Sequence, residues 1–196
     1  MLAPAHVGHW AMMRSIIRQA AAEGSFDHGL AGDAPDAQEF FARLKLALAS
    51  GYFVELDART GRAEAVAVPG YVFWPEGYES GIMPVGFGLF RALEGGYELW
   101  MAALDVSWRG KGHGHALFDS LFATPSGKKS WAVRVPHNAR YAATVDHLLR
   151  SYGFDPVGDT EQLRWFARRD APPALAAKIR NIVSSQPPST QHTTRT

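Results

Sequence analysis

The sequence predicts one domain of mixed α and β structure, with a mostly antiparallel central sheet flanked by helices. Three observations point to this fold class. Two amphipathic helical patterns precede the first convincing strand, alternating runs follow over 52–104, and helix and strand patterns then succeed one another up to residue 168. With 196 residues, 46% of them hydrophobic and 20% charged, the chain can bury one core and is too apolar for a disordered protein.

The N-terminal part is expected to form two helices. Apolar residues recur at helical spacing over 7–22, and Gly24 follows as a stop signal. The second helix begins near Asp36, which together with Glu39 has the spacing of a capping box, and it ends before Gly51. Both helices therefore lie ahead of the sheet.

The middle of the chain is expected to supply antiparallel strands. Apolar and polar residues alternate in short runs broken by glycine and proline, over 52–57, 63–68, 71–74 and 97–104. The stretch 75–96 receives no assignment, because it has six glycines among many aromatic residues. Aromatic side chains at Tyr71, Phe73, Trp74, Phe87 and Phe90 could line an acceptor pocket or form core.

The last part of the chain alternates between helices and strands. A helix is expected over 114–122, a strand over 131–135, a helix over 141–152 and one or two closing strands over 154–168. We expect the domain to span residues 1–170. Residues 171–196 are expected to form a short helix and a disordered C-terminal tail, because the final residues are polar and rich in proline.

Composition excludes several classes of function. The chain has no cysteine, which rules out disulfides, thiolate zinc sites and a cysteine nucleophile and fits a reducing cytoplasm. We expect neither a signal peptide nor a membrane span, because charged residues interrupt the first helix and no apolar run approaches 18 residues. A net charge of +1 argues against a protein that coats nucleic acid.

The charge is distributed unevenly along the chain. Residues 1–108 contain seven basic and thirteen acidic residues, whereas residues 109–196 contain thirteen basic and six acidic residues. One interpretation is that the second part holds an anionic ligand and the first admits a cationic one. The alternative is compositional drift without functional meaning.

The most informative segment is the strand over 97–104 with the loop and helix that follow it. Gly110, Gly112 and Gly114 let the main chain approach a ligand, and the start of a helix adds unpaired N–H donors and the positive end of its dipole. With Arg109 and Lys111 in the same loop, the pattern favours a diphosphate. The loop has neither the residue order of a P-loop nor the repeating strand and helix context of a Rossmann fold.

These residues resemble the GCN5-related N-acetyltransferases. The pyrophosphate loop of that family reads R/Q-x-x-G-x-G/A, which Arg109, Gly112 and Gly114 match, and Trp108 stands where the family commonly has an aromatic residue. Val106 departs from the pattern, because proline is frequent there. Residues 151–154, with the sequence SYGF, are similar to the Gly-Phe signature of the family, so the resemblance covers about residues 5 to 168.

The resemblance implies a sheet splayed between its fourth and fifth strands, with acetyl-CoA or another acyl-CoA in the gap as co-substrate. We expect no metal, because His113 and His115 have no carboxylate nearby in the sequence to complete a site. The residues expected at the cofactor are Leu104, Arg109, Gly110, Lys111, Gly112, His113, Gly114, His115 and Asn138. The histidines could equally belong to a solvated helix start. The acceptor would be an amine of unknown identity, and a homodimer is consistent with the family.

The resemblance also suggests groups for the chemistry. Glu98 resembles the fourth-strand glutamate that one branch of the family uses as a general base, often through water. The alternative is a strand glutamate that reaches solvent. The usual tyrosine acid of the family falls on Leu149, so Tyr152 is a substitute by type only, and its place in an apolar stripe also fits a core residue.

The leading hypothesis is therefore an N-acyltransferase that passes an acetyl group directly to a primary amine. The absence of a tyrosine at position 149 motivates a second hypothesis, an acyl-CoA-binding regulatory or interaction module without turnover. A third is an interaction protein in which the glycine loop is only a turn.

Overall fold

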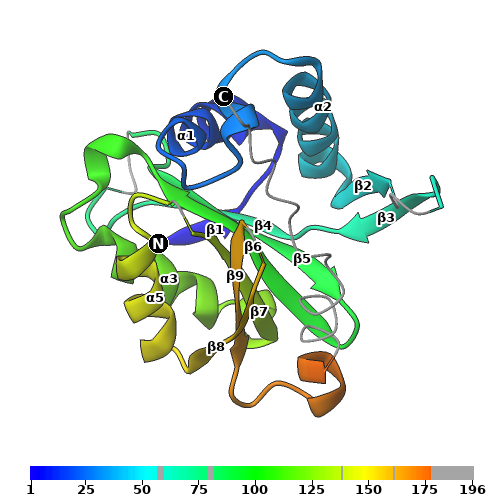
Figure 1. Cartoon of the computed structure of the whole chain (residues 1–196). Helices are drawn as coiled ribbons and strands as arrows, with labels where there is room; N and C mark the ends of the chain where they lie inside the picture. The colour runs from blue at the N-terminus through cyan, green and yellow to red at the C-terminus, as the bar shows by residue number, and fades with distance from the viewer. Residues whose placement is uncertain (57–59, 79–81, 138, 161, 178–196) are drawn as a thin grey trace, which may run out of the picture.

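The computed structural model describes residues 1–56, 60–78, 82–137, 139–160 and 162–177 (Figure 1). The helices are α1 (Trp10–Ala22), α2 (Pro35–Ser50), α3 (His113–Ala123), α4 (Pro125–Lys128) and α5 (Ala142–Ser151), with 3₁₀ turns over Val7–His9, His28–Ala31 and Val106–Trp108. The strands are β1 (Leu2–Pro4), β2 (Tyr52–Leu56), β3 (Ala63–Ala67), β4 (Gly70–Phe73), β5 (Gly86–Leu93), β6 (Gly96–Leu104), β7 (Ser130–Pro136), β8 (Phe154–Asp159) and β9 (Leu163–Arg168).

Seven of these strands form one mixed sheet. Their order is β1-β4-β5-β6-β7-β9-β8, and among the described residues β6 and β7 are the one parallel pair. Strands β2 and β3 form a separate hairpin beside this sheet. The mostly antiparallel sheet is thus confirmed, although 52–56 and 63–67 are not part of it.

Helices cover both faces of the sheet. Figure 1 shows α1 and α2 on one side and α3 and α5 on the other. One core cluster joins α1, α2 and the sheet around Met13, Leu44 and Phe87, and a second joins α3, α5 and the opposite face around Leu121 and Phe154. The site described below lies between these two layers.

The helices and strands follow the sequence patterns closely, with three differences. The capping box at Asp36 is wrong, because Ala34 is the N-cap residue, Pro35 occupies the first turn and no side chain caps the helix. The expected first helix begins as a 3₁₀ turn before α1. Strands β1 and β5 and the short helix α4 were not predicted.

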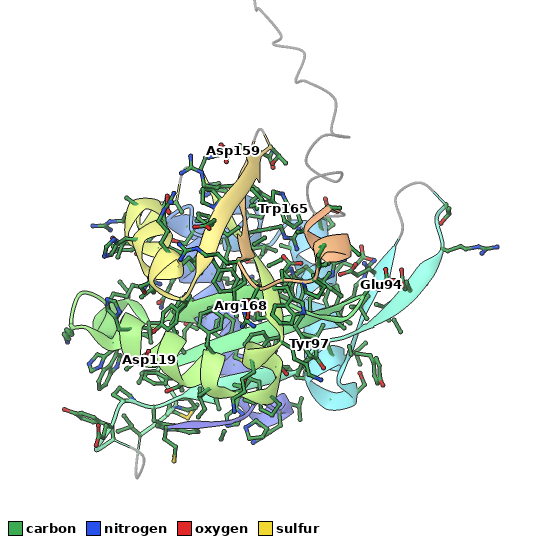
Figure 2. The ribbon with its side chains drawn as sticks, turned by 90° about the horizontal axis from the view of Figure 1, so that it is seen from below. Glu94, Tyr97, Asp119, Asp159, Trp165 and Arg168 are labelled. Atoms are coloured by element: carbon green, nitrogen blue, oxygen red, sulfur yellow. The ribbon has the colours of Figure 1, made fainter. Side chains whose placement is uncertain are left out.

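The C-terminal part that the structure describes packs on the sheet. Residues 173–177 are helical, and Leu175, 5% exposed, contacts a cluster that contains Ala132, Trp165 and Ala167. Figure 2 shows this short segment beside Trp165. The expected tail lies outside the described residues. None of the described helices has the length and apolar character needed to cross a bilayer.

Candidate active site

Strands β6 and β7 separate after a short parallel pairing. Their last paired residues are Leu99 and Val133, although β6 continues to Leu104 and β7 to Pro136. On the other side of β6, Leu89 lies opposite Met101 while Phe90 lies opposite Leu99, so Trp100 is an extra residue in a β-bulge. A bulge bends its strand, so the extra residue accounts for the divergence of the two strands.

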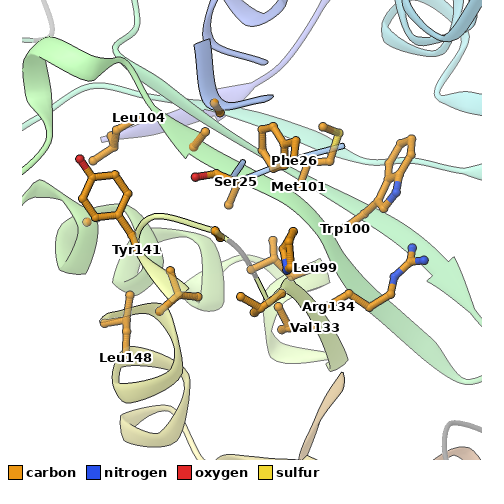
Figure 3. Close-up of a pocket in the computed structure, with 18 of the residues that line it drawn as sticks. Ser25, Phe26, Leu99, Trp100, Met101, Leu104, Val133, Arg134, Tyr141 and Leu148 are labelled. Carbon is orange, nitrogen blue, oxygen red and sulfur yellow. The ribbon is translucent and has the colours of Figure 1, made fainter. Parts of the chain in front are cut away.

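A cavity of about 520 Å³ fills the gap between the diverging strands (Figure 3). Its walls come from residues 99–104 of β6, residues 133–136 of β7, the first turns of α3, helix α5 and the segment that follows α1. In Figure 3, Leu104 and Tyr141 lie at one end of the cavity, and Trp100 and Arg134 lie at the other. Most of the lining side chains are apolar, which suits an elongated organic ligand.

The glycine loop opens at the Leu104 end of this cavity. Gly110 and Gly112 have φ angles of 72° and 82°, a region that favours glycine, and Gly112 is the N-cap residue of α3. A Cβ atom added at Gly114 would meet nothing within 4 Å. Over the fully described stretch 110–114, no main-chain N–H group donates a hydrogen bond to another described residue. The loop therefore offers successive free N–H donors beside a helix N-terminus, as an anion site requires.

Arg109 ties the loop to the rest of the fold. Its Nε donates to the carbonyl oxygen of Leu104 at 2.8 Å, its Nη1 forms an ion pair with Glu23 at the end of α1, and its guanidinium carbon lies 5.9 Å from the Tyr141 ring. Its buried Nη2 has no hydrogen-bond partner among the described residues. The side chain thus shapes the loop and keeps one donor available beside the cavity that it lines.

The row of free N–H groups over 110–114 is called the cradle below. The other loop residues predicted to bind the cofactor lie around it. The Nζ of Lys111 donates to the carbonyl oxygen of Ser107 at 2.8 Å, and the exposed side chain lies against Trp108. His113 is half-buried with its ring 5.3 Å from that of Trp108, whereas His115 is exposed. Asn138 lies outside the described residues. Among the residues described, no group of three or more histidines and carboxylates has metal-site geometry.

Glu98 is the buried member of a chain of ion pairs and does not line the cavity. The side chain is 1% exposed, and Oε1 accepts a hydrogen bond from Nε of Arg134. Oε2 lies 3.5 Å from Nη1 of Arg91, which also pairs with Glu55 of β2. Oε2 has no hydrogen-bond partner among the described residues.

Tyr152 points away from the cavity. Its hydroxyl donates to Oδ1 of Asp119 at 2.5 Å, and its ring packs between Phe118 and Phe122. Burial, together with the hydrogen bond to Asp119, raises the pKa of Tyr152, so the hydroxyl holds its proton firmly. Leu149, at the position of the family's tyrosine, is fully buried in the core. The placement of these two residues gives no support to a side-chain acid there.

The aromatic residues considered for an acceptor pocket belong to the core or, for Tyr71 and Trp74, pack against it while partly buried. Phe73, Phe87 and Phe90 are 0–1% exposed, and none of the five lines the cavity. The aromatic lining comes from Phe26, Phe40, Trp100 and Tyr141. Sequence reasoning also missed Arg134, whose signal was an arginine between two valines of a buried strand.

The fold is that of the GCN5-related N-acetyltransferases. The PaiA N-acetyltransferase from Thermoplasma acidophilum, in complex with coenzyme A, superposes with a TM-score of 0.54 at 10% identity, over 86% of this chain and 98% of that one. A ribosomal-protein-alanine N-acetyltransferase from Brucella melitensis gives 0.52 at 19% identity, over 85% and 97%. An acetyltransferase from Thermus thermophilus gives 0.51 at 16% identity, over 86% and 95%. No family model matches the sequence, and no curated protein matches it.

Proposed function

We propose that the protein transfers an acetyl group from acetyl-CoA to an amine by direct attack. The observation that carries this proposal is the row of free main-chain N–H groups over 110–114, which opens onto the gap between β6 and β7. A diphosphate matches the donors of the loop, and the main-chain groups of β6 beyond Leu99 have no strand partner across the gap. Apart from the carbonyl oxygen of Leu104, which accepts from Arg109, those that face the gap can form hydrogen bonds with the amide groups of the same ligand.

Acetyl-CoA supplies the thioester whose carbonyl carbon the amine attacks. The chain's own part is to bind, to orient and to exclude water. Unpaired main-chain N–H groups of β6 can polarise a carbonyl without any side chain, because such donors are fixed before the reaction begins. The apolar lining of the cavity strengthens these interactions by lowering the local dielectric constant.

For the general base we propose Glu98, which acts through Oε2 and a bridging water. Oε2 accepts no hydrogen bond from the described residues, which supports this role, and the water is needed because Glu98 does not line the cavity. We propose no side-chain acid, because Tyr152 is directed to Asp119. The leaving thiolate is then protonated by water.

The experiment that tests the site is a charge placed inside the cradle. Gly114→Asp puts a carboxylate among the free N–H groups without steric conflict, because a Cβ there meets nothing. Calorimetric titration with acetyl-CoA should show an affinity loss of about 100-fold, or about 2.7 kcal/mol. The matched control is Ala116→Asp, which adds the same charge at an exposed position of α3 that does not line the cavity. The control should change the affinity by less than about threefold, since its charge stays in solvent.

Two results would overturn parts of the proposal. Equal acetyl-CoA affinity in Gly114→Asp and the unaltered protein would show that the loop holds no diphosphate. Tight acetyl-CoA binding with no thiol release in the presence of any amine would favour the second candidate, an acyl-CoA-binding module without turnover. The buried Leu149, which replaces the family's tyrosine, is the observation in favour of that candidate.

A further inference from the structure

Arg134 presents two unused donor nitrogens at the cavity end that lies away from the glycine loop. The side chain lines the cavity, and Figure 3 shows its guanidinium directed toward the Trp100 side chain. Nε is held by Glu98, and the guanidinium carbon lies 5.0 Å from the centre of the Trp165 ring. Within the described part of the chain, Nη1 and Nη2 donate no hydrogen bond. The two nitrogens are therefore oriented by the protein but not satisfied by it.

The charges around Arg134 favour one kind of ligand. Arg91 and Arg134 are balanced by Glu55 and Glu98, so this network has no net charge. A simple ammonium ion would add a positive charge beside two guanidinium groups, and a simple carboxylate would add an unpaired negative charge. A zwitterion brings both charges together and leaves the balance unchanged. Its carboxylate can take both Nη donors in the two-point geometry that a guanidinium fork favours.

Aromatic side chains contribute to the wall at this end, and the cavity lining also includes Ser25 and Asp27. Trp100 projects from β6 after the bulge, Phe40 comes from α2, and Phe26 comes from the segment after α1. The rings of Phe40 and Trp100 lie 6.0 Å apart in an edge-to-face arrangement. A large apolar side chain of a ligand would contact these rings, whereas a second charge would be left unpaired there.

We propose that the acceptor is a free α-amino acid with a large apolar side chain, whose carboxylate is bound by Nη1 and Nη2 of Arg134. This inference rests on the proposed acetyl transfer. The ammonium group of the bound zwitterion first loses a proton to Glu98 through water. The neutral amino group then attacks the thioester carbonyl carbon, the C–N bond forms as the C–S bond breaks, and the sulfur leaves with the bonding electrons. The second amine proton passes to water, and the product is an N-acetyl amino acid.

The test compares acceptors that differ only in the carboxylate. Leucine, methionine, phenylalanine and tryptophan are assayed with acetyl-CoA, each against the amine that lacks its carboxylate. At least one amino acid should have a kcat/KM about 100-fold above that of its amine, because Nη1 and Nη2 of Arg134 can bind the carboxylate of the amino acid and the amine has none. Arg134→Gln should remove most of this preference, because the KM for the amino acid should rise by far more than the KM for its amine.

Arg134→Lys guards against a folding defect, because it keeps the positive charge beside Glu98 and loses only the fork. It should also lose the preference for the amino acid, whereas the control Arg169→Gln, on an exposed arginine paired with Asp155, should not. An equal loss for amino acid and amine in the Arg134 variants, or no preference in the unaltered protein, would overturn the inference.

A binding measurement separates this inference from the proposed function. Calorimetric titration of the protein, saturated with coenzyme A, with the four amino acids should show binding that Arg134→Gln abolishes. Amino acid binding without any transfer would refute acetyl transfer and support the carboxylate site. Transfer to amines without amino acid binding would support acetyl transfer and refute the carboxylate site.

Discussion

The two oxygens of Glu98 have different surroundings within one buried carboxylate. Oε1 accepts a hydrogen bond from Nε of Arg134, whereas Oε2 lies near Arg91 and accepts no hydrogen bond from the described residues. The first contact orients Nη1 and Nη2 of Arg134, which we propose bind the carboxylate of the amino acid. The second contact leaves lone pairs on Oε2 that can take a proton. Because each contact supports a different role, one substitution can separate positioning from base catalysis.

Glu98→Gln should lower kcat/KM by about 100-fold with an amine that has no carboxylate, because an amide cannot take the proton. The measurement is the rate of thiol release from acetyl-CoA. The matched control is Glu64→Gln, on an exposed glutamate of β3, which should leave kcat/KM unchanged. An unchanged kcat/KM in Glu98→Gln would assign Glu98 to positioning Arg134 alone.

At the scale of the element, strand β5 shows why a strand that contains glycines could not be predicted from the sequence. Glycine is depleted in strands, so Gly86 and Gly88 argued against a strand in the sequence. In the fold, a Cβ added at Gly88 would lie 2.4 Å from a methyl carbon of Leu121. The glycine thus lets α3 approach the sheet closely, and its reason is a neighbour 33 positions further along the chain.

Gly88→Ala should therefore destabilise the protein by about 1–3 kcal/mol, as expected when a packed core must accommodate an extra methyl group. Chemical unfolding followed by circular dichroism measures the change. Gly32→Ala is the matched control, since a Cβ there meets nothing within 4 Å, and it should not destabilise the protein. Equal stability of Gly88→Ala and the unaltered protein would show that Leu121 moves aside at no cost.

Elements with strong periodicity were predictable within a few residues. The expected helix over 141–152 is α5, Ala142–Ser151, and the expected strand over 131–135 is β7, Ser130–Pro136. Local turn chemistry was less reliable, because Pro35 rather than Asp36 sets the start of α2. The three-residue strand β1 was too short to show a period, and it exists because β4 pairs with it.

At the scale of the whole molecule, the position of the anion cradle was predictable and the other end of the cavity was not. The glycine loop is contiguous in sequence, so its donors could be inferred together. Arg134 acquires its role only because β7 pairs in parallel with β6 and places it beside Glu98, 36 positions earlier. Pairings between distant segments of this kind depend on topology, which no local pattern contains.

The uneven charge of the two parts of the chain also acquires a structural context. Arg109 of the basic part pairs with Glu23 of the acidic part, so its guanidinium charge is partly neutralised within the fold. The attraction of an anionic donor then depends on the loop N–H groups, the dipole of α3 and exposed cations such as Lys111. Contributions from exposed charges are screened by salt, with a Debye length of about 10 Å at 0.1 M and about 3 Å at 1 M.

We therefore expect the kcat/KM for acetyl-CoA to fall by about tenfold between 0.05 and 0.5 M salt, because screening weakens the attraction of its phosphates. S-acetylpantetheine is the matched donor, since it carries the same thioester and no phosphate, and its kcat/KM should change by less than about twofold over that range. Thiol release with one uncharged acceptor measures both series. An equal fall for the two donors would place the salt effect on the fold and not on the phosphates, and would contradict electrostatic capture of the diphosphate by the cradle over 110–114.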